Sequence, residues 1–202
     1  MSHQAIVYLA VLIPSVILHE VSHGLVAYAF GDDTAKRAGR LTLNPIAHVD
    51  PFGTLLLPFI LAITSGGVFG WAKPVPVNPR QLRNPRQQSL FVSLAGPGTN
   101  LLLALIASVV YVSGPRNDWT RGAIVVNVIL AAFNLLPIPP LDGSALIERV
   151  LPRRWWPGWL KFRHYSMGLV FALVLLWPSA LSRVFDEALR LWRDNVLVPM
   201  GL

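Results

Sequence analysis

Two histidines and one glutamate interrupt an apolar stretch near the start of the chain. His19 and His23 lie four residues apart, and Glu20 directly follows His19 in "VILHEVSHGLVAYAF" (16–30). Residues four apart share one face of a helix, so the two imidazoles can bind the same metal ion. His-Glu-x-x-His is the spacing found in zinc peptidases, where the glutamate stays off the metal and acts as a general base for a water molecule.

The apolar setting makes this motif more informative than it would be in a soluble protein. An acidic residue at the centre of a membrane helix costs about 2.5–3.5 kcal/mol on insertion scales, so ionisable residues inside a span are functional by default. The alternative is that the two histidines and the glutamate merely hydrogen-bond to neighbouring helices. The pattern favours a catalytic metal site over that alternative.

A catalytic zinc site needs a third protein ligand and one open position. A histidine at position 29 would supply this ligand in astacin-like enzymes, but Ala29 stands there. The best candidate is Asp142 in "PPLDGSAL", which follows an apolar stretch broken by prolines. The break frees the backbone to aim the carboxylate. An ordinary helix-capping aspartate is the alternative interpretation of Asp142.

The composition is that of an integral membrane protein. Of the 202 residues, 53% are hydrophobic and 13% are charged, whereas soluble domains carry about 25% charged residues. The net charge of +7 indicates basic loops facing anionic lipid rather than a nucleic-acid partner. The chain has no cysteine, which excludes disulfides and thiolate metal sites. We expect residues 1–202 to form a single membrane-embedded domain whose first apolar segment is retained.

The hydrophobic pattern predicts an all-α, polytopic helical bundle of about four spans. A transmembrane helix needs about 20 residues. Core spans are expected at about 5–30, 89–113 and 122–147, with an additional span at about 165–181. The segment 182–198 has apolar residues at helical spacing, which predicts an amphipathic tail at the membrane interface.

The loops between the first two spans contain three further features. "GRLTLNP" (39–45) alternates between apolar and polar residues and predicts a short strand. "FGTLLLPFILAIT" (52–64) is apolar but short, which suits a re-entrant segment or a short, tilted one. "WAKPVPVNP" (71–79) is too rich in proline for a helix, so we expect an extended stretch, either a strand edge or a polyproline-like segment.

The basic residues predict the orientation in the membrane. Twelve of the seventeen Lys and Arg residues lie in the loops 31–51, 65–88 and 148–163, and basic loops favour the cytoplasmic side. All twelve can face the cytoplasm only if 52–64 enters and leaves by the same face. We therefore expect a re-entrant segment, short strands near the cytoplasmic face, and an active site towards that side of the cell membrane. If 52–64 crosses instead, every later loop changes side.

Three motifs together resemble the site-2 protease family, the intramembrane zinc metalloproteases. They are "HEVSHG" (19–24), "AGPGTN" (95–100) and "FNLLPIPPLDG" (133–143), in that order on three successive core spans. "GWAKPVPVNP" (70–79) looks like the companion stretch of the small bacterial and archaeal members, which have neither a PDZ nor a CBS domain. The match covers most of the chain.

The resemblance implies a role for each residue of the site. The implied zinc ligands are His19, His23 and Asp142. Glu20 would be the catalytic base. Asn134 resembles the residue that helps to hold the substrate backbone or the oxyanion, and Asn100 looks like a polar residue of the middle core span that supports the site.

The activity implied by the resemblance is that of an intramembrane zinc-dependent endopeptidase. Such an enzyme hydrolyses peptide bonds within or near transmembrane segments, as in regulated intramembrane proteolysis. Its partners would be a single-span membrane protein as substrate and membrane lipid, with no nucleic acid; the substrate's identity and the oligomeric state stay open. An extended "WAKPVPVNP" or "GRLTLNP" stretch could hold the unwound substrate by β-augmentation.

Two other function classes remain open. One is a catalytically inactive zinc-binding membrane scaffold, although binding zinc needs no base and Glu20 is present. The other is a metal transporter, although its ligands would lie along a continuous path over several spans. His48 in "NPIAHVDP" could be an extra ligand or a gate, but we favour a surface or hydrogen-bonding residue.

Overall fold

The computed structural model describes residues 2–50, 53 and 72–202. The expected re-entrant segment 52–64 falls outside this part of the chain, apart from Gly53. The α-helices are α1 (His3–Ala29), α2 (Thr34–Arg37), α4 (Pro85–Ser113), α5 (Asp118–Asn134), α6 (Ser144–Val150), α7 (Trp156–Leu176) and α8 (Pro178–Trp192). Short 3-10 or π-helical turns are η1 (Pro45–His48), η3 (Pro79–Gln81), η4 (Arg153–Trp155) and η5 (Arg193–Leu197).

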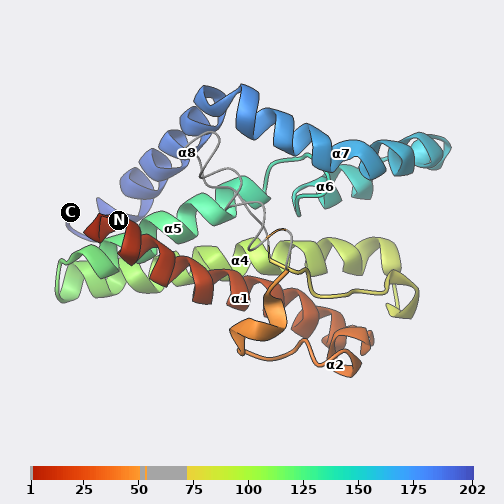
Figure 1. The fold of residues 1–202 in the computed structure, drawn as a ribbon, viewed down its shortest axis with the longest axis horizontal. Helices are drawn as coiled ribbons and strands as arrows, with labels where there is room; N and C mark the ends of the chain where they lie inside the picture. Colours follow the sequence, from red (N-terminus) through yellow and green to blue (C-terminus); the bar gives the residue numbers. More distant parts are fainter. Residues whose placement is uncertain (1, 51–52, 54–71) are drawn as a thin grey trace.

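Three helices, α1, α4 and α5, pack against one another and form the core of the molecule (Figure 1). α4 runs back along α1, and α5 returns beside α4. Where α4 meets α5, the small residues Ala104 and Ala107 pack with Ile124 and Val128. Small side chains let membrane helices approach closely enough for van der Waals contacts to hold them together.

The ends of α1 follow from its sequence. The Ser2 hydroxyl caps the helix by accepting a hydrogen bond from the Ala5 amide at 3.3 Å. At the other end Gly31 adopts a φ of +105°, a left-handed conformation that glycine takes without strain. The 27 residues of α1 extend over about 40 Å. They therefore cover the expected span at 5–30.

α4 combines an inward face that packs on protein with an outward apolar face. It begins at Pro85, four residues before the expected start at 89, because proline suits the first turn of a helix. On the outward face, Leu102, Ile106 and Val109 are all exposed at helical spacing. A long exposed apolar stripe of this kind is typical of a surface that faces lipid.

α5 is shorter than the span expected at 122–147. A capping box formed by Asn117 and Thr120 starts the helix at Asp118. The helix ends at Asn134 because the prolines at 137, 139 and 140 cannot continue it. Its 17 residues rise about 25 Å. Residues 135–143 then form an irregular loop that leads into α6.

The additional span expected at 165–181 is divided between two helices. α7 begins earlier, at Trp156, and its two parts meet at a bend of 54°. Pro178 then starts α8, which packs against α5. The tail expected at 182–198 is helical, but its residues Ala188, Leu189 and Trp192 pack on the α4–α5 contact. Part of its apolar face therefore packs on protein, while its position at the membrane interface stays a prediction.

The structure confirms an all-helical protein of the membrane class. Among the described residues, two helices, α1 and α4, are long and apolar enough to cross a membrane, and the bent α7 raises the number to three if it counts as one span. The expected number of about four spans is not confirmed, because prolines stop α5 before it reaches the length of a full span.

The short β-strands expected from the sequence are absent from the residues that the structure describes. Residues 39–45 form turns and bends that lead into η1. Residues 72–78 are irregular, and two prolines in this stretch have no amide hydrogen to contribute to a ladder. The amides of Lys73 and Val75 donate to the His48 carbonyl and the Glu20 carboxylate instead of to a neighbouring strand.

Candidate metal centre

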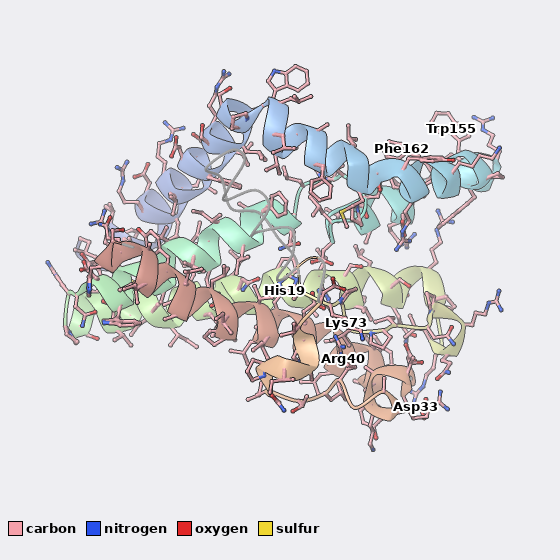
Figure 2. The ribbon with its side chains drawn as sticks, viewed as in Figure 1. His19, Asp33, Arg40, Lys73, Trp155 and Phe162 are labelled. Carbon is pink, nitrogen blue, oxygen red and sulfur yellow. The ribbon has the colours of Figure 1, made fainter. Side chains whose placement is uncertain are left out.

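Side chains from α1 and from the loop after α5 converge inside the helix bundle. Nε2 of His19 lies 3.1 Å from Oδ2 of Asp142, and Nε2 of His23 lies 3.4 Å from the same oxygen. The two Nε2 atoms are 3.1 Å apart. Figure 2 shows His19 in the middle of the molecule where α1 passes α4, whereas Asp33 lies beyond the end of α1. Folding thus brings together three residues that could hold one metal ion.

Each imidazole is oriented by a hydrogen bond at its other ring nitrogen. Nδ1 of His23 donates to the Val92 backbone carbonyl at 2.6 Å. Nδ1 of His19 lies 2.6 Å from Oδ1 of Asn100. A proton on each Nδ1 leaves the lone pairs of both Nε2 atoms pointing at the common centre. Partners of this kind are usual for histidines that bind metals, because they fix the tautomer and the ring orientation.

The arrangement fits a zinc ion. Oδ2 of Asp142 is buried and has no hydrogen-bond partner among the described residues. Three atoms that carry lone pairs therefore face one another, which is unfavourable unless a cation lies between them. In a tetrahedral site with zinc–ligand bonds of about 2.0–2.1 Å, neighbouring ligand atoms are about 3.3 Å apart. The separations of 3.1, 3.1 and 3.4 Å match that value.

Gly96 of α4 keeps the space between the two imidazoles open. A Cβ atom on Gly96 would lie 2.5 Å from Nε2 of His19 and 2.5 Å from Nε2 of His23. A Cβ atom does not approach a non-bonded nitrogen so closely, so any other residue would push the imidazoles apart or fill the centre. Gly96 of "AGPGTN" is therefore required for steric reasons, because α4 passes directly beside the site.

The loop that carries Asp142 is fixed at both ends. The Gly143 amide donates to the Asn134 carbonyl at 2.7 Å, which closes the loop on the end of α5. A Cβ atom on Gly143 would lie 2.2 Å from the Leu135 carbonyl oxygen, so this close approach requires glycine. At the end of α6, the Arg86 guanidinium donates to the carbonyls of Arg149 and Leu151 at 2.9 and 3.0 Å. The carboxylate of Asp142 is thereby held against α1.

Glu20 lies next to the metal-binding group but is not part of it. Its Oε2 accepts a hydrogen bond of 2.9 Å from the Val75 amide. The stretch 72–78 is in turn held from both sides: the Arg40 guanidinium donates to the Lys73 carbonyl at 2.6 Å, and Figure 2 shows Arg40 and Lys73 close together beside α1. The carboxylate of Glu20 is therefore oriented by a backbone amide of a distant segment.

Asp32, just beyond α1, fixes the far end of the same stretch. Its side chain is fully buried, and it accepts hydrogen bonds from the Asn78 amide at 2.6 Å and from the amide and the hydroxyl of Thr34. Burial opposes ionisation of Asp32, but the hydrogen bonds from Thr34 and Asn78 outweigh it and hold the pKa of this carboxyl below its usual value. A buried, ionised aspartate thus anchors the segment that reaches Glu20.

Comparison with known proteins identifies the family. Peptidase family M50 matches residues 7–117 and 113–177. The chain belongs to peptidase family M50. It is 42% identical over 201 residues to "Putative zinc metalloprotease YwhC" of Bacillus subtilis (strain 168), with 92% of this chain and 87% of that protein covered. No solved structure matches the chain.

Two further relatives share less of their sequence with this chain. "Putative zinc metalloprotease Rip2" of Mycolicibacterium smegmatis is 34% identical, with 86% of this chain and 67% of that protein covered. "Zinc metalloprotease MJ0392" of Methanocaldococcus jannaschii is 26% identical, with 85% of this chain and 42% of that protein covered. Membership of family M50 confirms the resemblance to site-2 proteases and the expectation of a zinc metalloprotease.

The remaining site candidates of this M50 peptidase, Asn100, Asn134 and His48, are not among the three residues that could hold the metal. Asn100 is fully buried, with Oδ1 at His19 and Nδ2 donating to Asn127 at 2.9 Å. Asn134 is half-buried, and its Nδ2 donates to the Leu130 carbonyl of its own helix at 3.0 Å. His48 lies outside the group of three; its ring is buried and hydrogen-bonds to the Thr42 carbonyl at 2.9 Å.

Three residues of the M50 site have no role in the sequence analysis. They are Val75, which contacts Glu20 through its backbone, and the buried residues Asp32 and Asn127. A backbone contact has no signature in the sequence. Asn127, in contrast, is a polar residue within an apolar segment, and its cost in that setting is a signal that could have identified it.

Proposed function

We propose that this chain is an intramembrane zinc endopeptidase that hydrolyses peptide bonds within or near transmembrane segments of other membrane proteins. The observation that carries the proposal is the convergence of His19, His23 and Asp142 on one centre, beside Glu20, on a helix long enough to cross a membrane. The names of the relatives support zinc as the metal and proteolysis as the reaction.

In this proposal His19, His23 and Asp142 would hold the zinc ion as its three protein ligands. When bound, the ion supplies Lewis acidity for the attack of water on a peptide carbonyl. The two imidazoles contribute neutral ligands, because their Nδ1 protons are donated to Asn100 and Val92. With the Asp142 carboxylate, the protein neutralises only part of the ion's charge.

Glu20 is the general base of the proposed reaction. Its Oε2 is held by the Val75 amide, which leaves Oε1 to take a proton from the attacking water. The same carboxyl group then gives the proton to the leaving amine. A carboxylate held by a backbone amide can rotate little, which suits repeated proton transfer at one position.

Asn134 is the proposed donor to the substrate backbone or the oxyanion. One N–H of its amide donates to Leu130, and an asparagine amide has two. The second can donate to a carbonyl that develops negative charge. Asn100 is too deeply buried to reach a substrate, so we assign it to holding His19.

We further propose a single-span membrane protein as substrate, in regulated intramembrane proteolysis, with an unwound segment held beside the stretch 72–78. This stretch lies next to Glu20, but the amides of Lys73, Val75 and Asn78 already donate within the protein. A substrate strand would therefore pair mainly with carbonyl groups of the stretch. A photo-crosslinker at Val77 in a Glu20→Gln background should capture a single-span protein, whereas a crosslinker at Ala38 should not.

We propose that the basic end of the bundle faces the cytoplasm of a cell whose membrane is crossed four times, by α1, α4, α5 with its loop, and α7. The loops around Asp32, Asn78 and Arg149 lie at one end of the core, and His3 approaches Asp118 at the other end at 3.4 Å. His19 lies ten residues before the end of α1, so the site would be about 15 Å below the basic end.

The absence of cysteine gives a direct test of this orientation. Single cysteines at Ala38 and Arg116, both exposed, would be labelled with a membrane-impermeant maleimide. The cysteine at 116 should react in intact cells, and the one at 38 only in inside-out vesicles. The reverse pattern would show that the site opens to the opposite side.

The central experiment compares wild type with Glu20→Gln. We expect both proteins to bind one zinc ion, measured by elemental mass spectrometry, because Glu20 is not a ligand in the proposed site. A membrane proteome should show an uncut single-span protein accumulating only with Glu20→Gln. If the two proteomes are identical while zinc is bound, the chain is a zinc-binding scaffold and not a protease.

A further inference from the structure

A line of buried amides connects His19 of α1 to α5 through α4. Asn100 of α4 and Asn127 of α5 are 0% and 2% exposed. Nδ2 of Asn100 donates to Oδ1 of Asn127 at 2.9 Å. Nδ2 of Asn127 donates to the Ala123 carbonyl at 2.9 Å and to the Ser15 hydroxyl at 3.0 Å. Every side-chain polar atom of these two asparagines has a partner.

The Ala123 carbonyl, at the end of the line far from the metal centre, sets the direction of all these hydrogen bonds. The Ala123 carbonyl can only accept, so the group of Asn127 that faces it must be the NH₂ group. Oδ1 of Asn127 then faces Asn100, and it can only accept. Asn100 must therefore turn its NH₂ group to Asn127 and its Oδ1 to His19.

The orientation of these amides determines the tautomer of His19 at the metal centre. Because Oδ1 of Asn100 can only accept, Nδ1 of His19 must carry the proton, and Nε2 keeps the lone pair that a metal needs. His23 needs no such device, because its Nδ1 faces a backbone carbonyl directly. The two histidines are thus fixed by different means.

We propose that Asn127 is a positioning residue for the metal site: it fixes the amide orientation of Asn100 and thereby the metal-binding tautomer of His19. The inference rests on the proposed zinc site but not on proteolysis. Without Asn127, Asn100 can rotate its amide by 180° at little cost and present NH₂ to His19. His19 would then accept at Nδ1 and carry its proton on Nε2, where it opposes the metal.

The test measures metal binding by the full-length protein in detergent, with Zn²⁺ and Co²⁺ alone as probes. Asn127→Leu removes both ends of the amide at similar volume. We expect the zinc affinity to fall about 10-fold to 100-fold, the range for lost partners of metal-binding histidines. The visible spectrum of bound Co²⁺ should change as well, because it reports the ligand geometry at the metal.

Two variants separate positioning from a general loss of stability. In Asn127→Asp, a neutral carboxyl group can donate to Ala123 and accept from Asn100, so zinc affinity and the Co²⁺ spectrum should stay near wild type. Ser108 is as deeply buried as Asn127, and Ser108→Ala removes the hydrogen bond of 3.0 Å that its hydroxyl accepts from Trp192 of α8, away from the metal centre. It should lower thermal stability and leave the zinc affinity unchanged.

A double variant tests whether Asn127 acts through Asn100. If it does, Asn100→Leu combined with Asn127→Leu should bind zinc no more weakly than Asn100→Leu alone. Additive losses of zinc affinity in the double variant would overturn the inference. Wild-type zinc affinity in Asn127→Leu would overturn it too, as would a zinc affinity in Asn127→Leu equal to that in Ser108→Ala. Should leucine prevent folding, Asn127→Ala gives the same comparison. Failure of wild type itself to bind zinc would instead refute the proposed function.

Discussion

The Val75 amide donates to Oε2 of Glu20 over 2.9 Å, and this contact links the His-Glu-x-x-His helix to a segment 55 residues further along the chain. The segment is fixed before it reaches Glu20 by Arg40 at Lys73 and after it by Asp32 at Asn78. The position of the proposed base therefore depends on a stretch that contributes no side chain to it. Only the backbone of Val75 takes part.

Removing this single amide should slow the reaction and leave the metal in place. Val75→Pro has no N–H to donate, and a hydrogen bond to a charged group contributes about 1.5–3 kcal/mol, so kcat should fall about 10-fold to 100-fold. The measurement is cleavage of a single-span substrate at saturation, together with zinc content.

Two matched variants serve as controls for the change at Val75. Val75→Ala keeps the amide, and Val77→Pro adds a proline to the same stretch without touching Glu20. Both should retain most of the activity. If Val77→Pro is as slow as Val75→Pro, the stretch acts through its overall conformation and not through the hydrogen bond to Glu20.

Gly96→Ala should abolish metal binding. The new methyl group would lie 2.5 Å from both Nε2 atoms, in the space that the ion would occupy. We expect zinc content to fall to background and activity with it. Gly98→Ala, two residues further along the same helix, meets nothing within 4 Å and should bind zinc normally. Equal zinc content in the two variants would show that the ion lies elsewhere.

The Asp32 carboxylate should make the protein sensitive to acid. Its pKa is lowered in the folded chain, so its stabilising effect is complete above the unfolded pKa of about 3.9 and is lost as the pH falls through the lower, folded value. Asp32→Asn should lower the melting temperature at pH 7, and the difference from wild type should shrink below about pH 4.

The neighbouring Asp33 provides the control for this prediction. It forms an exposed ion pair with Arg37 at 2.8 Å, and exposed helix pairs contribute only about 0.3–0.5 kcal/mol. Asp33→Asn should therefore melt close to wild type at every pH. A melting temperature for Asp32→Asn that is equally close to wild type would mean that the contact with Asn78 does not support the fold.

Asn134 should affect turnover rather than metal binding. If its free N–H stabilises the oxyanion, Asn134→Ala should lower kcat about 100-fold or more with zinc content and melting temperature unchanged. The contact with Leu130 offers a different role, in which the side chain merely terminates α5. In that case stability and zinc content would fall together with activity, and the oxyanion role would be refuted.

Local sequence was sufficient to identify the chemistry of the site. The spacing of His19, Glu20 and His23 follows from helix geometry, and the prolines before Asp142 predicted the broken helix that carries it. Composition predicted the apolar helices that house them. These features depend on residues near one another in the chain, so a single sequence is enough to predict them.

Features of the fold that depend on contacts between distant segments could not be predicted from local sequence. The stretches 39–45 and 72–78 have patterns compatible with strands, but a strand needs a partner, and the amides of Lys73 and Val75 found side-chain and loop partners instead. The segment 182–198 has an apolar face whose partner, α5, could not be deduced from periodicity alone. Propensity describes what a segment can do, and packing selects among the possibilities.

By itself, the sequence determined which groups could do chemistry here: two imidazoles and a carboxylate at helical spacing, and a distant aspartate beside a proline-broken helix. Only the tertiary structure decided that Asp142 reaches the imidazoles, that Gly96 leaves room between them, and that Val75 holds Glu20. The physical reason is that these contacts join segments remote in the chain. Their energies arise only when close packing brings lone pairs, amides and bare backbone to within hydrogen-bond distance.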